Sequence, residues 1–268
     1  MTAPRLAGSL DWMLKGMSPE DGFPILKAMG FDAVEHCFPY SRTPQEMSDL
    51  LKRNGLDISL IYTPCDFAGG DWGFASTPGR EEEFAKSFAI ALDYAQRVGC
   101  GVIGTLSGTI PEGADRTPYK EVLIANLAKA AKVARKAGVV ISLEPIASER
   151  SPLFALNTMK QGGCVVRAVG DEALGLCFDT LHVALEKGSV TRTAREYRDL
   201  INYLQLGNPP DRLGPGHGDL DIPYILREIL PDTKAIWLGC EYVVAESERR
   251  TEAINWAKPF IDAGLLRR

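Results

Sequence analysis

The stretch TPYKEVLIANLAKAAKVARKAGVVISLEP, from Thr117 to Pro145, contains the pattern that repeats along this chain. Its first part opens with Thr117-Pro118, has apolar residues at helical spacing and stops at Gly138, as amphipathic helices do. The apolar, β-branched run Val139–Glu144 follows and is typical of a buried strand. A helix that leads into a buried strand is the repeating unit of a parallel α/β sheet.

Units of this kind extend in both directions from the quoted stretch. They predict strands at Arg5–Leu10, Ala33–Cys37, Asp57–Tyr62, Val102–Ser107, Val139–Glu144, Leu174–Thr180, Ile201–Gly207 and Ala235–Val243. Eight strands that alternate with helices indicate an α/β fold of the (β/α)₈ TIM barrel type. Because no linker or low-complexity tract interrupts the 268 residues, we expect a single barrel domain over residues 1–268.

The predicted helices carry recognisable start and stop signals. Thr43-Pro-Gln-Glu46 is a capping box with proline at the first helical position, and Gly55 closes that helix. Further helices are expected from Ser18-Pro19 to Gly30, from Thr77-Pro78 to Gly99, from Thr117-Pro118 to Gly138 and from Asn157 to Gly170. Each glycine is expected to supply left-handed backbone before the next strand.

Charge and composition exclude several classes of protein. The chain has 30 Lys and Arg against 35 Asp and Glu, a formal net charge of −5, so no nucleic-acid partner is expected. No apolar run approaches the ~20 residues of a membrane span, and we expect a cytoplasmic protein without a membrane partner. The six cysteines form no CxxC pair and are expected as free thiols, and the presence of only three histidines favours a metal site built from oxygen ligands.

Four polar side chains stand at the carboxyl ends of the last four predicted strands: Glu144, Asp179, Gln205 and Glu241. In a parallel barrel these strand ends share one mouth, and neighbouring strands lie ~4.8 Å apart. Three carboxylates placed together need pairing, protonation or a cation. We therefore predict one bound divalent metal ion, with Mg²⁺ or Mn²⁺ preferred and Co²⁺ or Zn²⁺ as alternatives.

Glu144 and Glu241 flank the predicted metal ion, which gives both a catalytic role. A metal that chelates a carbonyl oxygen and the adjacent hydroxyl makes the C–H between them more acidic, and a flanking carboxylate then takes the proton. Return of that proton to the neighbouring carbon is an isomerisation. His182, three residues after Asp179, and Glu35, on the second strand, are predicted to contact the substrate.

Several motifs carry a resemblance to a known family. They are Gly-Phe-Asp-Ala-Val-Glu35, Phe-Pro-Tyr40, Leu-Glu144-Pro-Ile, Leu-Asn157-Thr, Phe-Asp179-Thr-Leu-His182 and Gly-Cys-Glu241-Tyr. Together they resemble the hydroxypyruvate isomerase family, within the xylose isomerase-like sugar isomerase and epimerase TIM barrels. The resemblance implies that the metal set is Glu144, Asp179, Gln205 and Glu241, and that the substrate-binding pair is His182 and Arg212.

Three positions depart from the family pattern on the expected substrate side. Strand five is followed by Ala-Ser-Glu149-Arg150, Asn208 stands where an acid is common, and strand three ends in Ile-Tyr62-Thr-Pro. Arg150 and Arg212 are predicted to bind a substrate carboxylate, because a guanidinium grips that group bidentately.

The leading hypothesis is a metal-dependent isomerase that converts hydroxypyruvate to tartronate semialdehyde, or acts on a related small hydroxy or oxo acid, through an enediolate. A ketose 3-epimerase, or an inosose dehydratase or sugar lyase, would use the same metal site on a sugar substrate. An endonuclease IV-like repair enzyme is disfavoured, because it needs several His ligands and a basic face. A metal-dependent ligand-binding protein is the non-enzymatic alternative, and a homo-oligomer is left open.

Overall fold

The structure is a computed structural model that describes residues 3–67, 69–186, 188–249 and 253–268. Within these ranges eight parallel strands close into a barrel in chain order. The strands are β1 (Arg5–Ser9), β2 (Ala33–Glu35), β3 (Asp57–Tyr62), β4 (Val102–Thr105), β5 (Val140–Leu143), β6 (Leu174–Asp179), β7 (Ile201–Gln205) and β8 (Trp237–Cys240). The predicted TIM barrel is confirmed.

Most strands end earlier at their carboxyl ends than the sequence predicts. For example, β4 stops at Thr105 rather than Ser107, and β8 stops at Cys240 rather than Val243. Beyond these residues the chain turns away from its neighbours into the loops of the mouth, so the ladder of hydrogen bonds cannot continue. Polar strand-end residues such as Glu241 therefore stand on the rim of the barrel, just past the paired segment.

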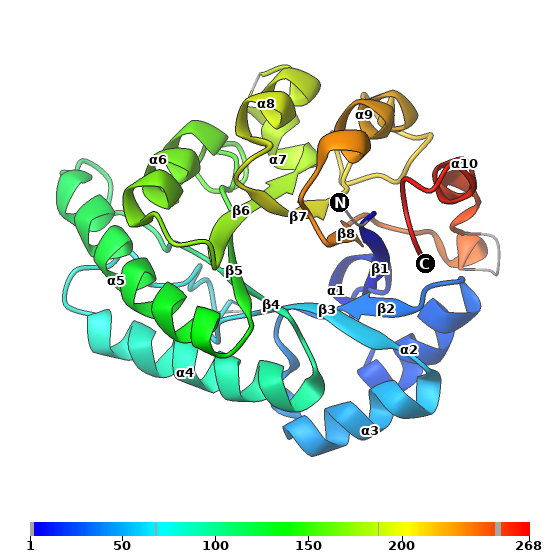
Figure 1. The fold of residues 1–268 in the computed structure, drawn as a ribbon, viewed down its shortest axis with the longest axis horizontal. Helices are drawn as coiled ribbons and strands as arrows, with labels where there is room; N and C mark the ends of the chain where they lie inside the picture. The colour runs from blue at the N-terminus through cyan, green and yellow to red at the C-terminus, as the bar shows by residue number, and fades with distance from the viewer. Residues whose placement is uncertain (1–2, 68, 187, 250–252) are drawn as a thin grey trace.

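Helices surround the barrel as an outer ring (Figure 1). The α-helices are α1 (Leu10–Met13), α2 (Pro19–Ala28), α3 (Pro44–Asn54), α4 (Glu81–Val98), α5 (Thr117–Lys136), α6 (Met159–Val169), α7 (Thr180–Leu185), α8 (Val190–Tyr197), α9 (Ile222–Ile229) and α10 (Lys258–Asp262). Short 3₁₀ helices are η1 (Pro39–Ser41), η2 (Leu230–Asp232), η3 (Glu246–Glu248) and η4 (Asn255–Ala257).

The predicted capping box of α3 is confirmed. The Thr43 side chain accepts a hydrogen bond from the Glu46 N–H at 3.3 Å, and the Glu46 carboxylate accepts one from the Thr43 N–H at 2.8 Å. Gly55 ends the helix in the left-handed region with φ 60°. Two orphan amides are thereby satisfied at the start of the helix.

Two predicted helix starts are wrong. The helix expected from Thr77-Pro78 begins only at Glu81, because Gly79 has φ 85° and interrupts the helical backbone. The helix expected to start at Asn157 is capped by Thr158 instead, in a capping box with Gln161. The Asn157 side chain is engaged elsewhere, since it donates to two carbonyls of the preceding loop.

Apolar side chains fill the barrel interior, so the barrel is a packed core rather than a pore. Leu60, Val102, Tyr203 and Trp237 belong to this inner cluster, and a larger apolar layer lies between the strands and the helices. The Arg5 guanidinium lies over the Trp237 ring at 4.7 Å from its centroid and covers one side of the ring. With the interior filled, polar chemistry is confined to the carboxyl end of the barrel.

The two ends of the described chain meet beside β1. The Leu6 N–H donates to the Arg267 carbonyl at 2.8 Å, and the Arg267 N–H donates to the Pro4 carbonyl at 2.8 Å. Arg5 and Arg267 thereby form an isolated parallel bridge next to the β1–β8 pair. Figure 1 shows the N and C marks close to each other on this side of the molecule.

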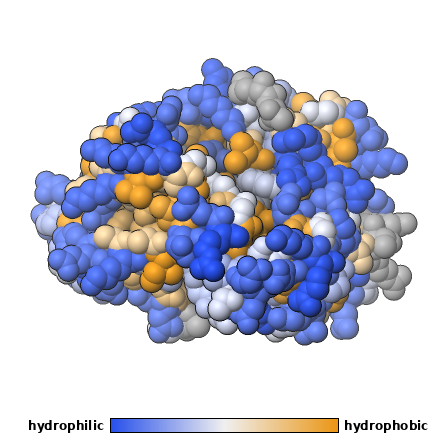
Figure 2. Space-filling view, turned by 60° about the horizontal axis from the view of Figure 1, so that its bottom comes forward, coloured by the Kyte–Doolittle hydropathy of each residue, from blue (hydrophilic) through white to orange (hydrophobic). Residues whose placement is uncertain are grey.

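The outer surface is mixed in polarity. Figure 2 shows hydrophobic residues in separate patches among hydrophilic ones on the face that it displays. Large exposed apolar side chains include Ile90 of α4 and Val133 of α5, with exposed fractions of 55% and 49%. None of the helices in the described ranges has the length and apolarity that a bilayer crossing requires.

Candidate metal centre and active site

Four polar side chains meet at the mouth of the barrel, from four consecutive strands. Asp179 and Gln205 are the last residues of β6 and β7, and Glu144 and Glu241 follow β5 and β8 by one residue. Their exposed fractions are 4% for Glu144, 2% for Asp179, 0% for Gln205 and 3% for Glu241. The barrel thus brings together the four residues that the sequence predicts as the metal set.

Direct hydrogen bonds orient these side chains. Gln205 Nε2 donates to Glu241 Oε1 at 2.8 Å, and the Tyr62 hydroxyl donates to Glu144 Oε2. The Leu181 N–H donates to Asp179 Oδ1 at 2.7 Å, which makes Asp179 the N-cap of α7. At least one polar atom of each of the four side chains is therefore held by a hydrogen bond within the protein.

Arg212, from the loop after β7, lies between two of the predicted metal ligands. Its Nη1 donates to Glu241 Oε2 at 2.6 Å, and its Nη2 lies 3.0 Å from Asp179 Oδ2. The guanidinium also lies over the Trp12 ring, 4.2 Å from the centroid. The backbone of Arg212 has φ 58°, which is uncommon for a residue with a Cβ. This loop conformation turns a side chain predicted to bind substrate towards the carboxylates.

Burial and mutual repulsion shape the ionisation of these groups. Burial, and then the charges of Glu241 and Asp179, raise the pKa of Glu144 well above its ordinary value. Burial also raises the pKa of Glu241, and the charge of Arg212 opposes that shift. Burial disfavours the charge on Arg212, but Asp179 and Glu241 outweigh it and raise the pKa of the guanidinium. The single positive charge of Arg212 therefore does not balance the three carboxylates Glu144, Asp179 and Glu241.

A divalent cation fits this donor set. Three carboxylates face one guanidinium, so the fully ionised set carries two excess negative charges, which one divalent ion balances. Asp179 Oδ2 is buried, and among the described residues its contact with Arg212 is an ion pair at 3.0 Å without a recorded hydrogen bond. One ligand atom each from Glu144, Asp179 and His182 lie within 4.8 Å of one another. Carboxylate and amide oxygens are the donors that Mg²⁺ and Mn²⁺ prefer.

His182 stands one helical turn after Asp179, in α7. Its Nε2 lies 3.7 Å from both Glu144 Oε1 and Asp179 Oδ2. The Ala147 N–H donates to Nδ1 at 3.3 Å, and Arg212 Nη2 lies 3.1 Å from Nε2, so a hydrogen-bond donor of the protein faces each ring nitrogen. Burial lowers the pKa of His182 to about 4, so the ring is neutral at pH 7.

A family model for xylose isomerase-like TIM barrels matches residues 23–260. The chain belongs to this family. The resemblance inferred from the sequence motifs is therefore confirmed, together with the fold that it implies.

Relatives that align over most of this chain are named as isomerases. A 2-oxo-tetronate isomerase from Cupriavidus necator is 34% identical over 261 residues, which cover 96% of this chain and 99% of the relative. A hydroxypyruvate isomerase from Escherichia coli K12 is 33% identical over 233 residues, covering 86% of this chain and 89% of the relative. The prediction that the chain is an enzyme of the isomerase class is confirmed.

A crystal structure of a family 2 AP endonuclease from Brucella melitensis has the same barrel. It matches with a TM-score of 0.88 at 29% identity and covers 96% of this chain and 99% of its own. The agreement extends over nearly the whole barrel and supports the same family membership.

Two further residues predicted to bind substrate occupy different surroundings. Glu35, at the end of β2, is 0% exposed, and both Tyr203 and the predicted metal ligand Gln205 donate to its Oε2. Arg150 is exposed, and its Nη2 donates to the Pro210 carbonyl at 2.5 Å in the loop that carries Arg212. Substrate contact by Glu35 and Arg150 stays a prediction.

Sequence reasoning missed an aromatic wall beside the site. The Phe67 ring contacts the rings of both Phe38 and Trp72, and Trp72 also contacts Phe154. Tyr62, which bonds Glu144, lies 6.0 Å from Phe38 between ring centroids. These aromatics come from the loops and strand ends after β2, β3 and β5. Loop aromatics that follow strand ends were the signal that could have indicated the wall.

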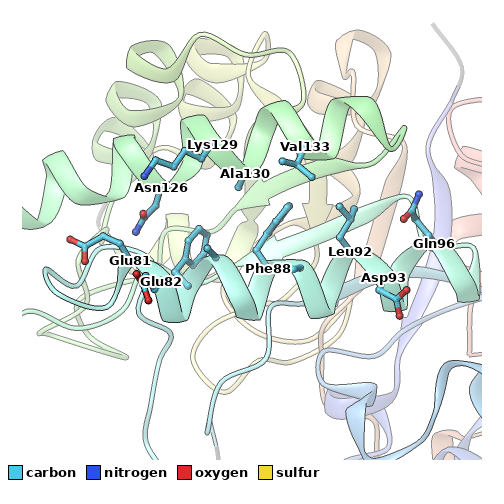
Figure 3. Close-up of a pocket in the computed structure, with 13 residues that line it drawn as sticks. Glu81, Glu82, Phe88, Leu92, Asp93, Gln96, Asn126, Lys129, Ala130 and Val133 are labelled. Carbon is cyan, nitrogen blue, oxygen red and sulfur yellow. The ribbon is translucent and has the colours of Figure 1, made fainter.

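A second concave surface lies on the outside of the barrel, between α4 and α5. It encloses about 420 Å³ and is floored by apolar side chains such as Phe88 and Leu92. Figure 3 shows Glu81 and Glu82 at one end of this groove and Asp93 towards the other. Acids spread along one helix do not converge on a common point, in contrast to the four strand-end residues.

Proposed function

We propose that this protein is a divalent-metal-dependent isomerase of a small 2-oxo acid that bears a hydroxyl on C3. Hydroxypyruvate is the first candidate substrate, and tartronate semialdehyde is then the product. The observation that carries the proposal is the buried set of Glu144, Asp179, Gln205 and Glu241 with Arg212 between two of its carboxylates. The named activities of the curated relatives point to the same substrate class.

Glu144, Asp179, Gln205 and Glu241 would hold the metal ion. When bound, a divalent ion polarises the carbonyl and the neighbouring hydroxyl of the substrate and so acidifies the C–H between them. Mg²⁺ or Mn²⁺ suits the oxygen donors of this set, with Co²⁺ or Zn²⁺ as substitutes.

The residues of the chain move the protons. One of the two flanking carboxylates, Glu144 or Glu241, takes the proton from C3 and leaves an enediolate. A proton delivered to C2, together with transfer of the hydroxyl proton from O3 to O2, gives the 2-hydroxy-3-oxo acid. The neutral His182, whose Nε2 lies 3.7 Å from Glu144 Oε1 and from Asp179 Oδ2, is placed to hydrogen-bond a substrate oxygen during this exchange.

Arg212 supplies the reason to expect an acid rather than a neutral sugar. Its guanidinium is buried at the mouth, and a buried arginine favours a carboxylate partner. The aromatic wall of Phe38, Phe67, Trp72 and Phe154 offers few polar atoms for additional sugar hydroxyls. Both features favour a short, charged substrate.

Metal removal tests the proposal. Chelation should abolish isomerase activity on hydroxypyruvate while circular dichroism stays unchanged, because the packed interior holds the fold. Addition of Mn²⁺ or Mg²⁺ should restore turnover. Activity that survives full metal depletion would contradict a metal-dependent mechanism.

Substitution of the two flanking acids tests their roles. Glu144→Gln and Glu241→Gln should each lower kcat by orders of magnitude, whereas the exposed Glu149→Gln serves as the matched control and should leave it unchanged. Deuterium uptake from solvent into the substrate distinguishes a lost base from a lost ligand.

A change in substrate mass other than this exchange would indicate elimination, and saturable binding without turnover would indicate a binding protein.

A further inference from the structure

Glu35 lies in a buried hydrogen-bond network that reaches Gln205 of the candidate metal site. Tyr203 donates its hydroxyl to Glu35 Oε2 at 2.8 Å, and Gln205 Nε2 approaches the same oxygen at 3.3 Å. Ser59 Oγ lies 2.9 Å from the Tyr203 hydroxyl and also donates to the Val34 carbonyl. The network therefore ties the side chain of Gln205 to the backbone of β2 through three intermediate groups.

The Gln205 amide has a defined orientation in this network. Its nitrogen faces two carboxyl oxygens, Glu35 Oε2 and Glu241 Oε1, both of which can accept its hydrogens. Its oxygen accepts from Cys177 Sγ, which lies on β6, the strand of Asp179. An amide can ligate a cation only through its oxygen, so the side that carries the nitrogen decides whether Gln205 is a competent ligand.

The backbone of β8 is shaped to admit Glu35. A Cβ on Gly239 would lie 2.2 Å from Glu35 Oε2 and 3.2 Å from a ring carbon of Tyr203. Any side chain at position 239 must therefore displace the Glu35 carboxyl. The register of β2 shifts between Val34 and Glu35, which pairs Glu35 with Leu60 of β3 and directs it into the barrel.

We propose that Glu35 is a positioning residue that holds the Gln205 amide with its oxygen turned to the metal. In this role it acts through Gln205, whose amide nitrogen it accepts from. The inference rests on the proposed function, because it assumes that Gln205 ligates a divalent ion. As a consequence, metal affinity depends on Glu35, which contacts the amide nitrogen of Gln205 and is not one of the four predicted ligands.

Four variants and one control test this role. Glu35→Leu removes the acceptor, Glu35→Gln keeps an oxygen that can accept from Tyr203 and Gln205, and Gly239→Ala displaces Glu35 without changing it. Tyr203→Phe removes one support of Glu35. Gly175→Ala is the steric control. Gly175 lies near the start of β6, at the end of the strand opposite Asp179, and a Cβ there would lie 2.5 Å from the Asn202 side chain.

The readout is Mn²⁺ affinity of the full chain, by calorimetry and by the electron paramagnetic resonance signal of bound Mn²⁺. Loss of a group that orients a metal ligand costs roughly 10–100-fold in affinity. We therefore expect that loss for Glu35→Leu and Gly239→Ala, and rescue to within about threefold of wild type in Glu35→Gln. Tyr203→Phe should weaken binding by roughly two- to tenfold. Gly175→Ala should lower the melting temperature with Mn²⁺ affinity unchanged.

The outcomes separate this inference from the proposed function. If the wild type binds Mn²⁺ and isomerises hydroxypyruvate while Glu35→Leu or Gly239→Ala binds Mn²⁺ as tightly, the positioning role is wrong and the proposed function stands. If the wild type binds no divalent ion, both are overturned. If Glu35→Leu does not fold, Gly239→Ala and Glu35→Gln decide. Equal losses in Glu35→Gln and Glu35→Leu would assign the effect to the charge of Glu35 and contradict the orientation role.

Discussion

The Arg212 guanidinium contacts two predicted metal ligands, and it is also the group that we expect to bind the substrate carboxylate. Loss of a charge-assisted contact costs about 1.5–3 kcal/mol. Arg212→Ala should therefore lower kcat/KM for hydroxypyruvate by roughly ten- to a hundredfold or more, with little change for neutral sugars. Steady-state kinetics on hydroxypyruvate, fructose, tagatose and psicose measure this difference.

Arg212→Lys is the matched variant, because it keeps the charge and loses the planar fork. It should recover only part of the lost kcat/KM. A wild type that turns over fructose, tagatose or psicose far better than hydroxypyruvate would remove the reason for a carboxylate substrate and place the chain's activity with the epimerases.

The residue scale also marks a limit of sequence reasoning. Glu144, Asp179, Gln205 and Glu241 could be predicted because each ends a strand, and strand ends of a parallel barrel share one mouth. The depth of Glu35 could not, since it depends on a register shift in β2 and on the missing side chain of Gly239. Alternation along a strand gives the direction of a side chain and leaves its height in the barrel undefined.

At the scale of elements, the loop after β5 is tied at both of its ends. Asn157 donates to the Ile146 and Ser151 carbonyls within the loop, and Thr158 then caps α6 by accepting from the Gln161 N–H at 3.2 Å. The loop carries Phe154 of the aromatic wall. Its conformation is therefore coupled to the start of α6.

Thr158→Ala should lower the free energy of unfolding by about 1 kcal/mol, because one N-cap hydrogen bond is lost. Thr43→Ala removes the equivalent bond of α3 and should cost the same amount. Urea unfolding of both variants gives the two numbers. A loss in either variant below about 0.3 kcal/mol would show that its capping box contributes little.

Capping patterns predict a helix end only where the capping contacts are local in sequence. Thr43 and Gly55 were located correctly because a capping box and a left-handed glycine leave a local pattern. Thr77-Pro78 has the same local pattern but lies before Gly79, whose positive φ breaks the helix. The cap at Asn157 was misplaced because that side chain bonds residues of the folded loop, a contact that local spacing does not encode.

At the scale of the whole molecule, the order of the strands in the barrel equals their order in the chain. This simple topology is why eight repeats of helix and strand were sufficient to predict the fold. The closing pair β1–β8 joins the most distant strands of the sequence, with Arg5 opposite Trp237. The predicted repeat does not contain that closing contact, which follows from the twist and tilt of the other seven pairings.

The contact between Leu6 and Arg267 has a consequence for how the chain can be cut and rejoined. Since the two ends are neighbours, a short Gly-Ser linker between them should allow circular permutation. New ends at Gly138, an exposed turn between α5 and β5 with φ 71°, lie away from the mouth and should leave Mn²⁺ affinity within about threefold of wild type. New ends at Gly70, in the loop between Phe67 and Trp72, should instead raise KM, as steady-state assays of the two permutants would measure. A Gly138 permutant that fails to bind Mn²⁺ would mean that the order of synthesis matters to this barrel. If it binds Mn²⁺ normally, the fold depends on which strands are neighbours, and any turn at the end of the barrel opposite the mouth can serve as the start of the chain.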